Sequence, residues 1–256
     1  RTKSCFAEVE GDSGAYRIAG AAKGAGMIEP NMATMLAFLT TDAVVEPPLL
    51  RQLLQDVVGE TFNKITVDGD MSTNDTVLLL ANGFSRVRIA SSDTVAVTAF
   101  REALARVCRH LAEKVVGDGE RITKVVDLKV DGAVDDSAAE RVARAIANSL
   151  LVKTSWYGND PNWGRLVDAA GYARVGLDFD KIDLFYDDEP TILQGEPQTR
   201  NRKKWQAVVE RESFAISLNL NQGEGSCQLL TTDLTEGYVD FNKSEATGTP
   251  NSSGDD

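Results

Sequence analysis

The chain has 256 residues, of which 42% are hydrophobic and 26% are charged. This is enough apolar sequence for one large domain or two small ones, and it excludes a chain that is disordered throughout. The formal net charge of −12 argues against nucleic acid or an anionic membrane as a partner, because both repel an acidic surface. No segment approaches the length of a membrane span, so we expect no membrane association.

Cysteine usage indicates a reducing compartment. Cys5, Cys108 and Cys227 are odd in number and lack metal-ligand spacing, so we expect neither a disulfide framework nor a metal site. The compartment is then the cytoplasm or, in a eukaryote, a mitochondrial or plastid matrix. The first residues contain neither an initiator methionine nor the apolar core of a signal peptide, so we expect a processed or truncated chain.

The single histidine limits the kinds of catalysis that the chain can support. His110 lies among charged residues in a long predicted helix, where a solvated histidine is far more common than a catalytic one. Mechanisms that rely on a Ser-His-Asp triad or a Cys-His pair are therefore poorly supported. A nucleophile in this chain must find its base elsewhere.

Strands and helices are predicted to alternate along the chain. The apolar run 35–39 suits either a buried strand or the start of a buried helix, and periodicity does not decide between them. Alternation, helical spacing and capping residues predict the other elements, in chain order: a β-hairpin over 5–20, a helix opened by Pro47 and Pro48, a short strand at 64–67, a turn with a helix cap at 72–74, a long helix over 91–116, a strand over 123–130, a helix with a capping box at 137–140, a helix capped by Asp160, and strands at 180–186, 214–220 and 226–233.

A glycine-rich loop with a lysine precedes the apolar run at 35–39. Gly24 and Gly26 allow backbone angles and close approaches that a side chain would block, and Lys23 stands beside them. On composition alone, such a loop more often turns the chain than binds a ligand. The spacing of a Walker phosphate loop is absent.

Five ordered blocks of the sequence resemble one known family. The blocks are 23–43 (KGAGMIEPNMATMLAFLTTDA), 66–77 (TVDGDMSTNDTV), 117–120 (GDGE), 160–165 (DPNWGR) and 232–242 (TDLTEGYVDFN). They are similar to the self-cleavage region and later motifs of the ornithine acetyltransferase family, the arginine biosynthesis bifunctional (ArgJ) proteins, which include the glutamate N-acetyltransferases. The resemblance implies an α/β (α+β) fold of the N-terminal-nucleophile type, the ornithine acetyltransferase/DmpA-like fold, with layered sheets flanked by helices.

The resemblance also implies a division into two chains. Residues 1–33 would form the C-terminal part of an α chain whose upstream part is missing here. Residues 34–245 would form the catalytic β chain, in one or two lobes, and 246–256 a flexible tail. The α and β chains of the family assemble as a heterotetramer, so we expect that assembly for this chain.

The activity that the resemblance implies is acetyl transfer through a threonine. The precursor would cleave itself between Ala33 and Thr34, and the hydroxyl of Thr34 would take the acetyl group from N²-acetylornithine and pass it to L-glutamate. A free α-amine has a pKa of roughly 7.7–8.0, so the amine of Thr34 itself can act as the base and no histidine is needed. No cofactor is implied, and whether acetyl-CoA also serves as a donor is left open.

Substrate-binding residues carry over from the family to matched positions: Lys23, Thr34, Glu120, Asn242 and Thr247. A lysine suits a substrate carboxylate and a glutamate suits an ammonium group. The sequence departs from the family in three ways. The upstream threonine-glycine pair that stabilises the oxyanion is absent, Arg121-Ile122 replaces small residues, and the chain continues past Thr247.

Two other functions remain compatible with the sequence. In an amidase or aminopeptidase of the same type, water rather than glutamate would resolve the acyl-enzyme. In an inactive fragment, the upstream oxyanion hole would be missing, and such donors are often worth several kcal/mol.

Overall fold

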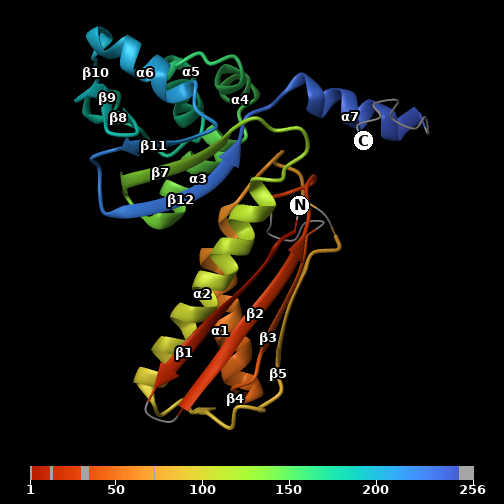
Figure 1. Ribbon diagram of the computed structural model, residues 1–256. Helices are drawn as coiled ribbons and strands as arrows, with labels where there is room; N and C mark the ends of the chain where they lie inside the picture. Colours follow the sequence, from red (N-terminus) through yellow and green to blue (C-terminus); the bar gives the residue numbers. More distant parts are fainter. Residues whose placement is uncertain (1, 12–13, 30–34, 72, 248–256) are drawn as a thin grey trace. The chain divides into compact units, whose positions relative to one another are not determined.

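The computed structural model describes residues 2–11, 14–29, 35–71 and 73–247, leaving aside the side chains of 244–247 (Figure 1). The chain divides into two compact units. The first consists of 1–65 and 69–118, and the second of 66–68 and 119–256. Each unit contains a β-sheet and helices, as the predicted α/β class requires. The predicted division into chains at residue 34 concerns a covalent cleavage and stays a prediction.

The first unit is built on a four-stranded sheet in the order β1-β2-β3-β5. Its elements are β1 (Ser4–Gly11), β2 (Gly14–Lys23), β3 (Leu36–Thr41), β4 (Val44–Val45), α1 (Pro47–Glu60), the 3-10 turn η1 (Phe62–Lys64), β5 (Thr76–Ala81), β6 (Arg88–Ile89) and α2 (Thr94–Val116). The antiparallel pair β1–β2 confirms the predicted hairpin. The apolar run after residue 35 forms a strand, with β3 antiparallel to β2 and parallel to β5.

One face of this sheet packs against α2. The predicted apolar stripe of the helix is buried throughout, and its members are Phe100, Leu104, Val107, Leu111 and Val115. Gly20 lies where the strand meets the helix, because a Cβ built there would lie 2.8 Å from Cδ1 of Leu111 and 2.6 Å from Cδ2 of Leu39. A missing side chain thus lets helix and sheet approach closely.

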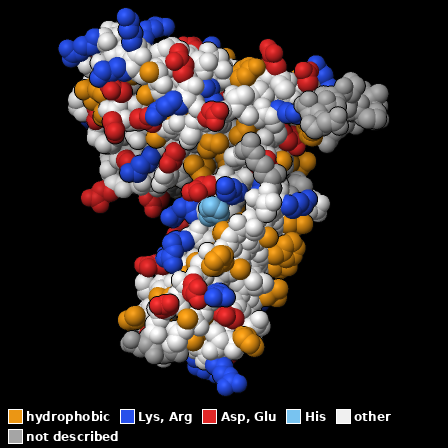
Figure 2. Space-filling view, in the orientation of Figure 1, with side chains coloured by type: hydrophobic (Ala, Val, Ile, Leu, Met, Phe, Trp, Pro, Cys, Tyr) orange, Lys and Arg blue, Asp and Glu red, His pale blue; other side chains and the backbone are white. Residues whose placement is uncertain are grey.

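The opposite face of the same sheet is open and apolar. The exposed fractions are 70% for Phe6, 48% for Phe38, 44% for Leu78 and 61% for Leu80. The strand register aligns Phe38 with Leu78, and Phe6 and Leu80 lie in the neighbouring row across the sheet. Figure 2 shows hydrophobic side chains gathered along one side of this unit. We call these four side chains the open sheet face.

The second unit has a six-stranded sheet in the order β10-β9-β8-β11-β7-β12. Its elements are β7 (Val125–Ala133), α3 (Asp136–Ala147), α4 (Leu150–Tyr157), α5 (Trp163–Gly171), η2 (Phe179–Lys181), β8 (Asp183–Tyr186), β9 (Glu189–Leu193), β10 (Glu196–Pro197), η3 (Thr199–Asn201), α6 (Arg202–Val209), β11 (Ser213–Asn219), β12 (Gly225–Thr232) and α7 (Glu236–Thr247). Strands β7, β8, β11 and β12 and helices α3, α4, α5 and α6 share one buried core. Trp156 packs edge-on against Phe214 within it.

Several predicted local features are wrong. Residues 64–67 do not form a strand: η1 ends there, and the N–H of Thr66 donates to the carbonyl of Leu230 at 2.9 Å. No helix follows 72–74, because the β-prone run after it pairs with β3. Helix α3 is capped by Asp135, which accepts the N–H of Ala138 at 2.7 Å, and not by the predicted box.

The start of helix α5 and the start of the predicted tail differ from the prediction, and helices α6 and α7 were not predicted. Helix α5 begins at Trp163 after an N-cap at Asn162, two residues later than predicted. Helix α6 lies at the end of a polar stretch whose sequence shows no clear helical pattern. Helix α7 occupies the segment 236–247, of which the predicted tail 246–256 shares the last two residues. The rest of that tail lies outside the described residues.

The substitution Gly20→Ala tests the contact between sheet and helix in the first unit. We expect it to lower the free energy of unfolding by about 1–3 kcal/mol, because the new methyl group has no space between Leu39 and Leu111. The matched control is Gly11→Ala, where no atom of the described residues, apart from the chain neighbours, lies within 4 Å of the new Cβ and the chain-entropy change is the same. Urea unfolding of both variants is the measurement, and equal midpoints would contradict the close approach.

Candidate functional site

The predicted site residues belong to both units. Lys23 lies in the first unit, and Glu120 and Asn242 lie in the second. Ala33 and Thr34 lie outside the described residues, and so does the side chain of Thr247, whose backbone ends α7. Each group is therefore described within its own unit.

Lys23 is the last residue of β2 and is exposed. Its Cα pairs with that of Leu36, the first residue of β3 and the second residue after Thr34 in the chain. Gly24 has a φ of 150°, and a Cβ there would lie 3.1 Å from Cδ1 of Ile28. The glycine thus lets the chain leave the sheet while Ile28 stays buried.

Met35 is held at both of its backbone polar groups. Its N–H donates to Oδ1 of Asp75, and its carbonyl accepts the N–H of Thr76 at 3.0 Å. Its side chain is buried. Burial raises the pKa of Asp75, while the hydrogen bond from Met35 acts in the opposite direction. Asp75 was not predicted as a site residue, because the sequence before it indicates a helix cap and not a strand beside β3.

Glu120 and Asn242 meet although 122 residues separate them. The amide of Asn242 donates to Oε2 of Glu120 at 3.2 Å and to the carbonyl of Tyr238, one turn earlier in α7, at 2.9 Å. Glu120 is half-buried. The structure therefore brings together the two site residues that the resemblance assigns to this unit, from the loop after α2 and from α7.

Arg121, one of the departures from the family pattern, also contacts α7. Its guanidinium carbon lies 5.9 Å from the ring centre of Phe241, which is a cation–π distance. Its carbonyl accepts the hydroxyl of Thr235 at 2.7 Å. In addition, the hydroxyl of Tyr238 donates to Oδ2 of Asp68 at 3.2 Å. The contacts of Arg121 tie α7 and the residue before it to the loop that carries Glu120, and the bond of Tyr238 ties α7 to the segment 66–68.

Asp233 fixes the other end of the Glu120 loop. Its buried carboxylate accepts the N–H groups of Thr123 and Lys124, both at 3.0 Å, and the hydroxyl of Thr123. Burial lowers the pKa of Lys124, and Asp233 counteracts this shift. The backbone leading from Glu120 into β7 is thus held by a charged acceptor.

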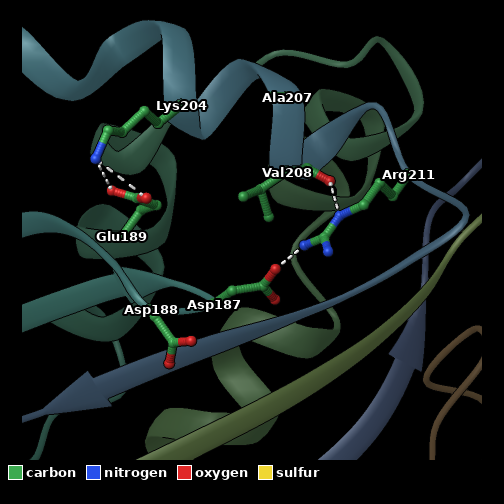
Figure 3. A pocket seen from close by; sticks show the side chains of 7 residues that line it. All are labelled: Asp187, Asp188, Glu189, Lys204, Ala207, Val208 and Arg211. Carbon is green, nitrogen blue, oxygen red and sulfur yellow. Dashed lines mark hydrogen bonds and ion pairs between the residues drawn. The ribbon is translucent and has the colours of Figure 1, made fainter.

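Two hollows occur away from the predicted site residues. One, of about 470 Å³, lies in the second unit between the β8–β9 turn and α6, and Figure 3 shows its lining residues. Its two cations are already paired, Lys204 with Glu189 at 2.9 Å and Arg211 with Asp187. Both of its cations are thus neutralised by carboxylates, so neither indicates a site for an anionic ligand.

The other hollow, of about 300 Å³, lies beside α2 in the first unit. His110, half-buried, lines it with Lys3 and Asp118. Burial alone would raise the pKa of Asp118, but the hydrogen bond and charge of Lys3 hold it below its usual range. None of the described site residues lines this hollow, although Gly117 and Asp118, from the block that ends at Glu120, do.

Membrane-spanning helices, metal-binding clusters and disulfides are all absent from the described part of the chain. Within it, no helix combines the length and apolar character needed to cross a membrane. No group of three or more His, Cys, Asp or Glu side chains in these ranges could hold a metal ion. The three cysteines are all free, and burial raises the pKa of Cys108 to about 12.

The sequence of the chain matches a model of the ArgJ family over residues 1–247. It is 41% identical over 241 residues to the arginine biosynthesis bifunctional protein ArgJ of Staphylococcus epidermidis, which covers 94% of this chain and 61% of that protein. It is 45% identical over 244 residues to the glutamate N-acetyltransferase of Methanopyrus kandleri, covering 94% of this chain and 62% of that protein. The chain thus spans about three fifths of the length of these relatives.

A solved structure has the same fold. The crystal structure of the arginine biosynthesis bifunctional protein argJ from Bacillus halodurans superposes with a TM-score of 0.78 at 38% sequence identity. The match covers 82% of this chain and 99% of that chain. It confirms the predicted fold class.

Removing the carboxylate of Asp233 should loosen the Glu120 loop. Asp233→Ala leaves the N–H groups of Thr123 and of the buried Lys124 without their acceptor, and we expect the free energy of unfolding to fall by about 3 kcal/mol. The control is Asp127→Ala on β7, whose carboxylate accepts from the side chain of Gln228. Chemical denaturation measures both, and a loss of the same size in the two variants would show that Asp233 has no special role.

Proposed function

Because the chain belongs to the ArgJ family, we propose that it transfers an acetyl group from N²-acetylornithine to L-glutamate in arginine biosynthesis. The name of the Methanopyrus relative, glutamate N-acetyltransferase, supports the acceptor. The observation that carries the proposal is the pairing of Lys23 with Leu36, because it brings a cation to the strand that begins two residues after Thr34.

The proposed nucleophile is Thr34, freed by cleavage of the Ala33–Thr34 bond. In that step the Thr34 hydroxyl attacks the carbonyl of Ala33, and water then hydrolyses the resulting ester. The solved chain of the Bacillus relative is compatible in length with such a cleavage, since 82% of the present chain suffices to cover 99% of it. A relative cleaved at the position of Thr34 would yield a chain shorter than this one.

The proposed transfer proceeds in two steps, acetylation of Thr34 and transfer of the acetyl group to glutamate. The α-amine of Thr34 takes the proton of its hydroxyl, and the oxygen attacks the acetyl carbonyl of acetylornithine. The C–N bond breaks, ornithine leaves with that proton, and an acetyl ester of Thr34 remains. The amine of glutamate then attacks the ester, and its proton returns to the threonine oxygen.

The remaining site residues take binding roles in this proposal. Lys23 would bind a substrate carboxylate, and Glu120 would bind a substrate ammonium group, with Asn242 orienting its carboxylate. Thr247 is the weakest of these assignments, although the match to the family ends at this residue. The oxyanion donors would come from the further length that the relatives possess.

We propose a heterotetramer of α and β chains, in the cytoplasm or an organelle matrix, that works without a cofactor. The word bifunctional in the names of the relatives supports acetyl-CoA as a second acetyl donor. The whole protein would then combine glutamate N-acetyltransferase and amino-acid N-acetyltransferase activities.

Product analysis tests the reaction. The protein, expressed with any sequence that precedes residue 1 in its gene, is incubated with acetylornithine in the presence and absence of glutamate. We expect N-acetylglutamate and ornithine in equal amounts, formed only when glutamate is present. Free acetate at the same rate with or without glutamate would identify a hydrolase and refute the transferase.

Substitution of the nucleophile separates its roles. We expect Thr34→Ala to abolish both cleavage and transfer, because the hydroxyl is lost. Thr34→Ser should retain some of each, because the hydroxyl and amine remain. Thr40→Ala, at an exposed position of β3, is the control and should cleave normally. Mass spectrometry of the mature protein is the measurement, and a β chain that starts at another residue would contradict the assignment.

A further inference from the structure

The segment 66–68 is held by the second unit, although its neighbours on both sides along the chain belong to the first. Thr66 and Val67 are buried. The N–H of Thr66 donates to the carbonyl of Leu230 in β12 at 2.9 Å, and its hydroxyl donates to Oδ1 of Asn148, just after α3, at 2.9 Å. The three residues therefore form a strap across the end of β12, and we call them the β12 strap.

A buried cation supports this strap from α4. Nζ of Lys153 donates to the carbonyl of Thr232 and, at 3.3 Å in both cases, to the hydroxyl oxygens of Thr231 and Thr232. An ammonium group can only donate, so the proton of the Thr232 hydroxyl must point away from it. That hydroxyl lies 3.3 Å from the carbonyl oxygen of Val67 and 3.0 Å from that of Asp233. Lys153 thus directs the hydroxyl of Thr232 toward these two carbonyls.

Asp68, the last residue of the β12 strap, connects it to α7. Its Oδ2 accepts the hydroxyl of Tyr238 at 3.2 Å, and both side chains are half-buried. A hydrogen bond to a carboxylate is stronger than one between neutral groups. The carbonyl of Tyr238 accepts the amide of Asn242 at 2.9 Å, and the same amide donates to Oε2 of Glu120 at 3.2 Å. Consecutive hydrogen bonds therefore lead from the strap to the candidate substrate-binding pair.

Helix α7 depends on polar contacts of this kind for its position. Among its described side chains, those of 236–243, none is buried, so the helix lacks the apolar face that usually places a helix. The hydroxyl of Thr235 accepts the N–H of Tyr238 at 3.0 Å, which caps the first turn. A Cβ built on Gly237 would lie 3.1 Å from Cβ of Arg121, so this turn approaches the neighbouring loop closely. A change in one polar contact should therefore move the helix.

We propose that Asp68 is a positioning residue for substrate binding: by accepting the hydroxyl of Tyr238, it holds α7 where Asn242 reaches the carboxylate of Glu120. This inference rests on the proposed function, in which Glu120 binds the ammonium group of the substrate. While the bond is made, the amide of Asn242 fixes one oxygen of Glu120 and so orients the carboxylate. When it is lost, α7 shifts and binding weakens, but the acetyl-transfer step is unaffected.

The test compares Tyr238→Phe with Tyr172→Phe in the full-length protein. Tyr172 is the matched control, because its hydroxyl donates to the carbonyl of Ala145 at the same distance of 3.2 Å and in the same unit. Each substitution removes one hydroxyl and keeps the ring, so both variants should fold. We expect similar unfolding midpoints for the two.

The kinetic constants should differ. We expect Tyr238→Phe to raise KM for acetylornithine about fivefold to tenfold with kcat within about twofold, because a binding group is displaced and the reacting groups are not. Asp68→Ala should raise KM at least as much, and adding Tyr238→Phe to it should raise KM no further, because the bond is already lost. Tyr172→Phe should keep both constants. An unchanged KM in Tyr238→Phe, or effects that multiply in the double variant, overturns the inference.

A second measurement is independent of activity. Amide hydrogen exchange in the absence of substrate, followed by mass spectrometry, reports how firmly α7 is held. We expect exchange within 236–243 to be about tenfold faster in Tyr238→Phe and in Asp68→Ala, and unchanged in Tyr172→Phe. If the unsubstituted protein does not consume acetylornithine, the proposed function fails, while hydrogen exchange still decides on Asp68. Equal exchange rates in all of these proteins overturn the inference.

Discussion

The first unit depends on the pairing of β3 along both of its edges. Strand β3 runs antiparallel to β2 and parallel to β5, so its register is fixed from two sides. A slip by one residue would turn every side chain of the strand to the wrong face of the sheet. The same register brings Lys23 from one neighbour and Asp75 from the other to the end at which Met35 enters the sheet.

Carboxylates that accept backbone N–H groups recur where strands begin or end. Asp42 does so in the first sheet, and Asp187 and Asp233 in the second unit. In Asp187 and Asp233 both oxygens have partners, a cation in the former and a hydroxyl in the latter. Asp75 differs, because one of its oxygens is buried without a partner among the described residues. The same carboxylate–backbone contact thus recurs with its second oxygen satisfied to different extents.

The sequence was informative where the determinants are local or periodic. The stripe of α2 and the hairpin β1–β2 follow from spacing and alternation, and both are present. The sequence was uninformative where a strand pairs with a partner far away along the chain. The partnership of β3 with β5 joins residues 40 positions apart, so neither the strand at 76–81 nor the role of Asp75 could be inferred from the neighbouring sequence.

The candidate site also depends on contacts between residues that are far apart in the sequence. Glu120 and Asn242 were chosen by resemblance, and no local pattern indicates that a loop and a helix so far apart in the sequence meet. Helix α7 itself was missed, since its polar sequence has a weak apolar stripe. Its attachment rests on single contacts, such as Arg121 with Phe241, which composition does not reveal.

The open sheet face gives the first unit a particular response to temperature. Phe6, Phe38, Leu78 and Leu80 hold an apolar surface against water on a rigid sheet. The free-energy gain from covering such a surface is mainly entropic near room temperature and is accompanied by a negative change in heat capacity. Association through this face therefore weakens on cooling and strengthens on moderate warming.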